Sequence, residues 1–175
     1  AFVAVAAALA STPVAAVQTN APKAATTPIK VETVAGGLEN PWGLQFLPDG
    51  RPIVTERPGR LRIIGKDGKL SSPIASVPKV FAQGQGGLLD VRLAPSFAKD
   101  GMVFLSYAEP RGDGKAGTTV ARARLVLEGS SGRLEELGAI FRQEPAVAAS
   151  QHFGSRIVPT PDGSLFITTG DRGSQ

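Results

Sequence analysis

The feature that most restricts the fold of this chain is a pair of short apolar runs joined by a Pro-Asp-Gly turn, which occurs twice. The pattern occupies residues 44–56 (LQFLPDGRPIVTE) and 156–168 (RIVPTPDGSLFIT), with a looser copy at residues 91–106. Short runs bounded by Gly, Pro and Asp are typical of antiparallel strands joined by tight turns. The turn prolines Pro48, Pro95 and Pro161 lie 47 and 66 residues apart, and propeller blades recur at roughly 40 to 50 residues or more. The sequence therefore predicts an all-β fold, a β-propeller, with an open β-sandwich as the alternative.

From residue 29 to residue 175 the chain divides into three sets of expected strands, with no helix longer than one turn. The expected ranges are Val31–Val34, Gly43–Leu47, Ile53–Glu56, Leu61–Ile64 and Ile74–Val77, then Leu88–Leu93, Met102–Tyr107, Thr119–Leu127 and Leu137–Arg142, then Ser155–Val158 and Leu165–Thr169. These sets make about two and a half blades, whereas a propeller typically has about 4 to 8. We therefore expect the chain to be the N-terminal part of a longer protein, truncated at its C-terminus and inactive by itself.

Residues 1–28 predict a secretory signal sequence followed by a linker. Residues 1–16 are almost entirely Ala, Val, Leu and Phe, and small residues offer cleavage sites after this stretch. The following Ala, Thr, Pro and Lys residues suit a linker better than the alternative, an Ala-rich buried helix. We expect a periplasmic or secreted protein.

Composition narrows the function classes. The chain has 42% hydrophobic and 19% charged residues, as folded domains do, and its net charge of +4 comes from scattered Lys and Arg. Without a basic run, we expect no nucleic acid as a partner. Cysteine is absent from the sequence, which excludes a disulfide framework and thiolate chemistry.

Blade topology indicates where chemistry would occur. Asn40, Gln85 and His152 each lie about three residues ahead of an expected innermost strand, so all three should line one mouth of a central channel. Antiparallel partners have a constant index sum, and a hairpin centred on the second Pro-Asp-Gly turn brings His152 next to Asp171. A carboxylate beside an imidazole fixes its tautomer and supports the imidazolium. His152 is therefore a candidate general base, although a lone His is more often structural or simply exposed.

Two further residues are candidates for ligand binding. Gln85 lies in a glycine-rich stretch, residues 83–89 (QGQGGLL), where glycines would allow a flat ligand to approach, although a flexible connection is the alternative. Arg57, Arg60, Arg156 and Arg172 could meet carboxylates of an acidic cofactor. We prefer Arg172 because it is expected in an exit loop. No metal ligand can be named.

Six motifs together resemble the soluble glucose/sorbosone dehydrogenase family, in particular its aldose sugar dehydrogenase branch. They are residues 37–44 (GLENPWGL), 55–61 (TERPGRL), 84–90 (GQGGLLD), 105–109 (LSYAE), 152–156 (HFGSR) and 170–173 (GDRG). The resemblance implies a six-bladed propeller in the periplasm, with pyrroloquinoline quinone (PQQ) as cofactor, an aldose sugar as substrate and a soluble or membrane electron acceptor. It implies that His152 takes the proton of the anomeric hydroxyl while hydride passes to the quinone, giving a lactone. Gln85 would contact cofactor or substrate, and Asp171 would support His152.

The same resemblance implies calcium, with its ligands in later blades. In the glucose-specific branch an Asp precedes the catalytic His, whereas this chain has Gln151, so we do not expect narrow glucose specificity. Two other functions stay open: a non-catalytic propeller that binds sugar or protein, and a propeller lactonase. A lactonase would need a carboxylate-rich metal centre in the channel, and the His152–Asp171 pair favours the dehydrogenase.

The apolar N-terminus generates the first testable prediction. We expect export, with the mature protein beginning between Ser11 and Lys23. N-terminal sequencing of the exported protein checks this, and an exported protein that retains Ala1 would contradict it.

Overall fold

The computed structural model describes residues 28–173, so the predicted signal sequence and linker lie almost wholly outside the described residues. The chain divides into two units, residues 1–32 and residues 33–175. The described part of the first unit, Pro28–Glu32, contains no helix or strand. Within the described residues, no helix is long and apolar enough to cross a membrane.

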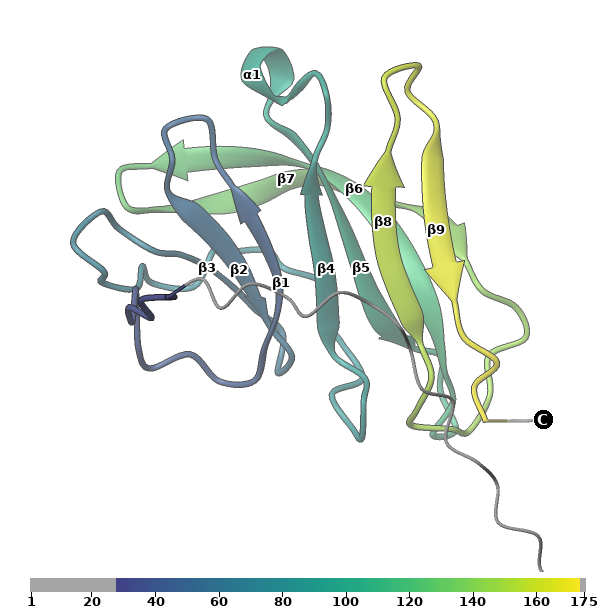
Figure 1. Cartoon of the computed structure of the whole chain (residues 1–175). Coiled ribbons are helices and arrows are strands. Elements are labelled where there is room, and N and C mark those ends of the chain that lie inside the picture. Colours follow the sequence, from purple (N-terminus) through teal and green to yellow (C-terminus); the bar gives the residue numbers. More distant parts are fainter. Residues whose placement is uncertain (1–27, 174–175) are drawn as a thin grey trace, which may run out of the picture. The chain divides into compact units, whose positions relative to one another are not determined.

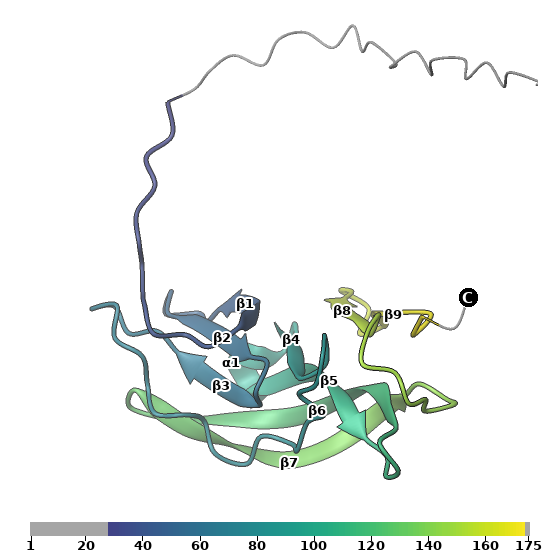
Figure 2. The same ribbon diagram turned by 90° about the horizontal axis from the view of Figure 1, so that it is seen from below.

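The second unit is built from three antiparallel sheets. The first contains β1 (Pro41–Phe46), β2 (Pro52–Glu56) and β3 (Arg60–Ile63), and the second contains β4 (Leu88–Leu93), β5 (Met102–Pro110), β6 (Ala116–Glu128) and β7 (Ser131–Arg142). The third contains β8 (Gly154–Pro159) and β9 (Leu165–Thr169), and α1 (Phe97–Asp100) is a single turn. Figure 1 shows β1, β4 and β8 side by side, and Figure 2 shows β4 to β7 following one another outward. The all-β, blade-like prediction is confirmed, while closure into six blades stays a prediction.

The two Pro-Asp-Gly turns have the same hydrogen bonds. Leu47 N donates to Arg51 O at 2.9 Å, and Thr160 N donates to Ser164 O at 2.9 Å. In each turn the Asp side chain accepts a backbone N–H two residues later, at 3.0 Å in both, as Asp does in tight turns. The glycines of the two turns have φ of +85° and +88°. The sequence repeat is thus a structural repeat, with β1–β2 and β8–β9 as equivalent hairpins.

Side-chain hydroxyls join each sheet to the next. Thr55 Oγ1 in β2 accepts from Gly43 N at 2.7 Å and donates to Leu89 O in the next innermost strand. Ser106 Oγ in β5 occupies the equivalent place, accepting from the N–H of the inner strand at 2.8 Å and donating to Ser155 O. Both hydroxyls are fully buried, so each satisfies a backbone group on both strands that it joins. This repeated link sets the spacing of β1, β4 and β8.

The main core lies between the first two sheets. It is composed of aliphatic side chains at alternating strand positions, including Ile53, Leu61, Leu88, Val103 and Leu105, each with 0% exposure. A smaller cluster around Leu89 and Phe153 lies near the start of β4 and β8. Such burial supplies the main favourable contribution to folding.

Two predicted strands are wrong. Val31–Val34 forms no strand, and Val31 and Val34 are 89% and 68% exposed. Its β-branched residues favour an extended chain, but a strand also needs a partner strand. In Ile74–Val77 only Ala75 pairs, in a parallel bridge with Arg133 of β7. β6 begins earlier than predicted because it pairs with β5 as far as Pro110. β7 begins earlier because the β6–β7 hairpin extends beyond β5 to reach this segment.

The exposed face of β8 and β9 leads to a prediction about the 175-residue chain expressed by itself. Val158 and Phe166 pair on this face and are 50% and 68% exposed. Thr168 Oγ1 accepts from Arg156 N at 2.9 Å, as Thr55 and Ser106 accept in their blades. We expect the 175-residue chain to aggregate and to show no sugar-dependent dye reduction with added quinone and calcium, because repeat arrays need neighbouring repeats for stability.

Light scattering and a thermal melt check this expectation. Phe166→Asp should reduce aggregation, while Leu127→Asp, which changes another exposed apolar residue away from this face, should not. A monodisperse monomer that melts cooperatively and reduces the dye would contradict the prediction.

Candidate active site

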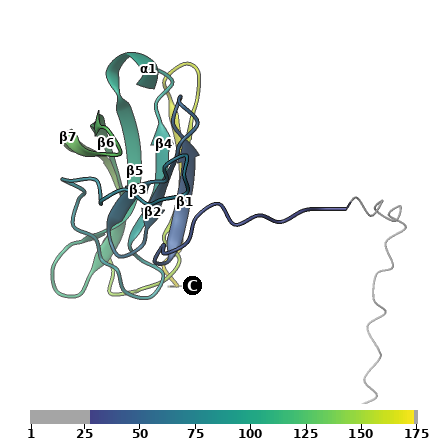
Figure 3. The same ribbon diagram turned by 90° about the vertical axis from the view of Figure 1, so that its left-hand side faces the viewer.

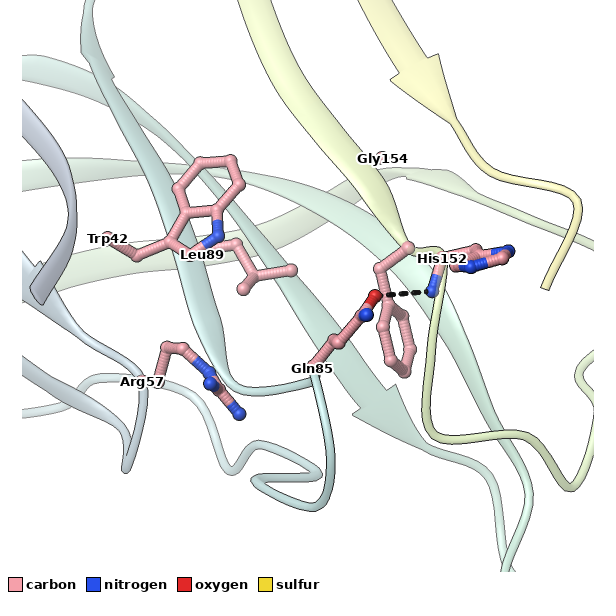
Figure 4. A pocket seen from close by; sticks show the side chains of 7 residues that line it. Trp42, Arg57, Gln85, Leu89, His152 and Gly154 are labelled. Atoms are coloured by element: carbon pink, nitrogen blue, oxygen red, sulfur yellow. Dashed lines mark hydrogen bonds between the residues drawn. The ribbon is translucent and has the colours of Figure 1, made fainter. Parts of the chain in front are cut away.

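The loops that lead into β4 and β8 meet at a pocket of about 300 Å³. Figure 3 shows that α1 lies at one end of the strands and the exit of β9 lies at the opposite end, where these loops are also found. The lining residues are Trp42, Arg57, Gln85, Leu89, His152, Phe153 and Gly154 (Figure 4). The structure therefore brings Gln85 and His152 together, as the topology predicted. Asn40 instead contributes its carbonyl to the neighbouring turn, where it accepts from Arg57 N at 3.1 Å.

His152 and Asp171 are in direct contact. Nδ1 of His152 lies 2.7 Å from Oδ1 of Asp171, and the two side chains are 49% and 43% exposed. The predicted register holds at the Gly154–Thr169 pair, next to His152. The rest of the hairpin is shifted by one residue, with Val158 opposite Phe166, and a β-bulge between Gly154 and Ile157 makes up the difference. A carboxylate accepts hydrogen bonds only, so Nδ1 carries the proton and Nε2 is the basic atom of the neutral ring. The proximity prediction is confirmed; the catalytic role stays a prediction.

Asp171 is held as a carboxylate by two donors. Gly173 N donates to its Oδ1 at 2.8 Å, and this bond together with the bond from the His152 ring lowers the pKa of the Asp171 carboxyl from its ordinary value of 3.8. An ionised Asp171 stabilises an imidazolium at His152.

The close approach of the two loops requires a glycine at position 170. A Cβ atom at Gly170 would overlap the carbonyl oxygen of His152. His152 itself has φ of +52°, a left-handed conformation in which His is less disfavoured than most residues. The backbone at this position is therefore constrained on both sides of the hairpin.

The side chain of Gln85 contacts the backbone of His152. The Gln85 side-chain oxygen accepts from His152 N at 2.9 Å (Figure 4), and Gln85 N donates to Ser150 O at 2.7 Å. The nitrogen of the Gln85 side chain is thus the group available to a ligand in the pocket.

The predicted reason for the glycines beside Gln85 needs correction. Cβ atoms at Gly84, Gly86 and Gly87 would overlap backbone oxygens of Ser150, Phe81 and Arg57, respectively. These glycines therefore allow chain segments to pack closely, rather than allowing a ligand to approach the backbone. Ser150 and Arg57 are distant from these glycines in sequence, so the glycine pattern alone does not reveal the packing against them.

Of the four candidate arginines, Arg57 lies in the pocket. Its Nε donates to Gly86 O at 3.0 Å and its Nη2 donates to Gly84 O, so it also supports the loop that carries Gln85. Arg60 pairs with buried Glu56 at 2.8 Å, and Arg156 pairs with buried Asp90 at 2.9 Å. Arg57 was not the arginine preferred from the sequence, although, like Arg172, it lies in the exit loop after the second strand of a hairpin.

Arg172 is buried, with 4% exposure, and it does not line the pocket. Its guanidinium donates to Gln151 O at 2.9 Å, to Ala116 O at 2.7 Å and to Ala149 O. It lies 3.7 Å from the centre of the Phe153 ring. These contacts favour a structural role over the predicted cofactor contact.

Trp42 and Phe153 are further lining residues that the sequence analysis did not select. The ring of Trp42 lies 4.4 Å from the Arg156 guanidinium, and Phe153 is 3% exposed. Within residues 28–173, no three His, Cys, Asp or Glu side chains converge as metal ligands would. The pocket thus combines flat apolar side chains, a cation, an amide and an imidazole with a carboxylate behind it.

A family model described as glucose/sorbosone dehydrogenase matches residues 38–175. Aldose sugar dehydrogenase YliI of Escherichia coli K12 is 44% identical over 149 residues, which cover 85% of this chain and 40% of that protein. A crystal structure of a glucose dehydrogenase superposes with a TM-score of 0.78 at 47% identity, over 83% of this chain and 42% of that one. The PQQ-bound aldose sugar dehydrogenase of Streptomyces coelicolor has a TM-score of 0.71 at 32% identity, over 82% and 42% of the two chains. The chain thus spans about two fifths of the length of these proteins.

The two donors to Asp171 generate a prediction. We expect the Asp171 carboxyl to titrate below 3.8, and His152→Ala to raise its pKa only part of the way back, because the Gly173 N–H remains. A carbon-13 NMR titration checks this, with Asp171→Asn identifying the resonance. Since folding lowers this pKa, the stabilisation is present above the ordinary value and is lost as pH falls through the lowered one. A wild-type pKa at or above 3.8 would contradict the geometry.

Proposed function

We propose, from the premise that the chain belongs to the glucose/sorbosone dehydrogenase family, that the whole protein is a PQQ-dependent dehydrogenase of aldose sugars. The observation that carries the proposal is the His152–Asp171 pair at a pocket on the end of the innermost strands. Relatives named for aldose sugar and glucose oxidation, and one solved with PQQ, support the same reaction class.

The residues present fit a flat, anionic quinone. Half-buried Trp42 offers aromatic surface in the pocket, and Arg57 offers a cation with a donor geometry that suits carboxylates. The volume of about 300 Å³ lies at the lower end of the range of ligand pockets. Arg57 and the Gln85 side-chain nitrogen are the groups of this chain that would hold the cofactor. When bound, PQQ supplies a two-electron acceptor for the hydride of the substrate.

His152 acts on the substrate as a general base. Its Nε2 would take the proton of the anomeric hydroxyl, and bound PQQ would be the acceptor of the hydride from the anomeric carbon. The C–H and O–H bonds break, a C=O bond forms, and the product is a lactone. Asp171 holds the ring through Nδ1 and stabilises the imidazolium that the proton transfer creates.

The remaining parts of the proposal follow from the family. The whole protein would be exported, would bind calcium through residues beyond this chain, and would pass electrons to a soluble or membrane acceptor. With Gln151 ahead of His152, we propose a range of aldoses as substrates rather than glucose alone.

Kinetics of the whole protein test the proposal. His152→Ala should lower kcat by about 10²- to 10⁴-fold, the usual contribution of a general base, with the Kd for PQQ nearly unchanged. Asp171→Asn should lower kcat less, because the base survives while its orientation is impaired. Asp162→Asn is the matched control, since it changes a carboxylate in the turn at the far end of the same hairpin.

Three results would contradict the proposal. A His152→Ala protein with wild-type turnover would remove the base. A wild-type protein that binds sugar without oxidising it would indicate a binding propeller, and one that hydrolyses lactones would indicate a lactonase.

A further inference from the structure

We propose that Arg172 is a positioning residue, which clamps the loop carrying His152 to the loop carrying Asp171 and so holds the catalytic pair together. The inference rests on the proposed function for its catalytic consequence, whereas the clamp itself stands on the contacts of the guanidinium. It replaces the expectation that Arg172 contacts the cofactor.

The clamp joins three segments of chain. Arg172 follows Asp171 directly, and its guanidinium reaches the carbonyls of Ala149 and Gln151, immediately before His152. Its third bond, to Ala116 O at 2.7 Å, anchors this assembly to the start of β6. The entry loop of β8 and the exit loop of β9 are thus tied to one another and to the neighbouring sheet.

The backbone around the pair would not keep its shape without such ties. His152 has φ of +52° and Arg172 has φ of +61°. Non-glycine residues in the left-handed region persist only where the surrounding structure holds them, at a cost of roughly 1–3 kcal/mol each. The Arg172 hydrogen bonds restrain both residues, because the guanidinium belongs to Arg172 and two of its acceptors, Gln151 O and Ala149 O, lie just before His152.

Only arginine suits this place. Its planar fork presents several N–H donors in fixed directions, so Nε, Nη1 and Nη2 each serve a different carbonyl. Lysine has one nitrogen on a flexible stem and would reach fewer of these carbonyls. A smaller apolar residue would remove the guanidinium donors of the Gln151 and Ala149 carbonyls and would leave Ala116 O with the Val147 N–H alone, at 3.2 Å.

The charge of Arg172 is compensated in an unusual way. Among residues 28–173 it forms no ion pair within 4 Å, so carbonyl dipoles and the face of the Phe153 ring take the place of a carboxylate. Burial without a carboxylate lowers the pKa of its guanidinium. Burying a cation is costly unless it is hydrogen-bonded, and here each of the three guanidinium nitrogens donates to a carbonyl.

The test uses Arg172→Met and Arg172→Lys in the whole protein, with Arg122→Met as the control because Arg122 is an exposed arginine on β6. We expect Arg172→Met to lower kcat by about 10²-fold, the effect of a misplacement near 1 Å, with the Kd for PQQ unchanged. Arg172→Lys should lower kcat less than Arg172→Met does. In a His152→Ala background, Arg172→Met should lower kcat little further, because the residue acts through His152.

Amide hydrogen exchange provides a readout that does not depend on activity. The Gln85 amide donates to Ser150 O and the His152 amide donates to the Gln85 side chain, so both bonds involve the clamped loop. Both amides should therefore exchange faster in Arg172→Met and in Arg172→Lys. In Arg122→Met they should exchange at the wild-type rate. If Arg172→Met does not fold, Arg172→Lys carries the same measurement.

The outcomes separate this inference from the proposed function. If Arg172→Met weakens PQQ binding in both the wild-type and the His152→Ala backgrounds, Arg172 contacts the cofactor, and the clamp is overturned. Unchanged exchange at both amides would also overturn it. A wild-type protein without sugar oxidation would remove the proposed function, while the exchange rates would still decide whether Arg172 holds the loop.

Discussion

The arrangement of this protein depends on the buried carboxylate of Asp90, which joins β4 to β8. Asp90 has 0% exposure and accepts bonds from Arg156 Nη1 at 2.9 Å and Ile157 N at 2.9 Å in β8. It also accepts from Val91 N at 3.0 Å and Arg92 Nε at 3.3 Å within its own strand. A buried charge is tolerated when its partners satisfy it, and here two backbone N–H groups and two partly exposed guanidinium groups do so. Gln85 precedes β4 and His152 precedes β8. Because Asp90 fixes how these two strands lie beside each other, it places the two residues at one pocket.

The first and third sheets share a turn ahead of their innermost strand. Asn40 and His152 both precede an innermost strand, and both are left-handed, with φ of +47° and +52°. Asn is among the residues that tolerate this conformation best, so the first blade carries the turn without a reactive group. In the third sheet the same turn presents an imidazole to the Asp171 carboxylate. The same backbone turn thus carries different side chains in the first and third sheets, and the proposed function rests on the imidazole of the third.

Features that depend on local pattern were predictable from the sequence, and features that depend on distant partners were not. The Pro-Asp-Gly turns predicted the hairpins, and the symmetry of the second hairpin placed His152 beside Asp171. The burial of Arg172 was not predictable, because it depends on its positive φ and on the irregular loop before β8. Ile74–Val77 has the composition of a strand, but only Ala75 pairs, with Arg133 of β7.

The central claim is that Nε2 of His152, oriented through Nδ1 by Asp171, meets the reacting hydroxyl of the sugar. A crystal structure of the whole protein with the reduced cofactor and an aldose measures this directly. The account predicts the anomeric oxygen within about 2.6–3.2 Å of His152 Nε2, with the Nδ1 contact to Asp171 kept. A sugar bound in the channel with its anomeric oxygen against another basic group, and with His152 facing solvent, would contradict it.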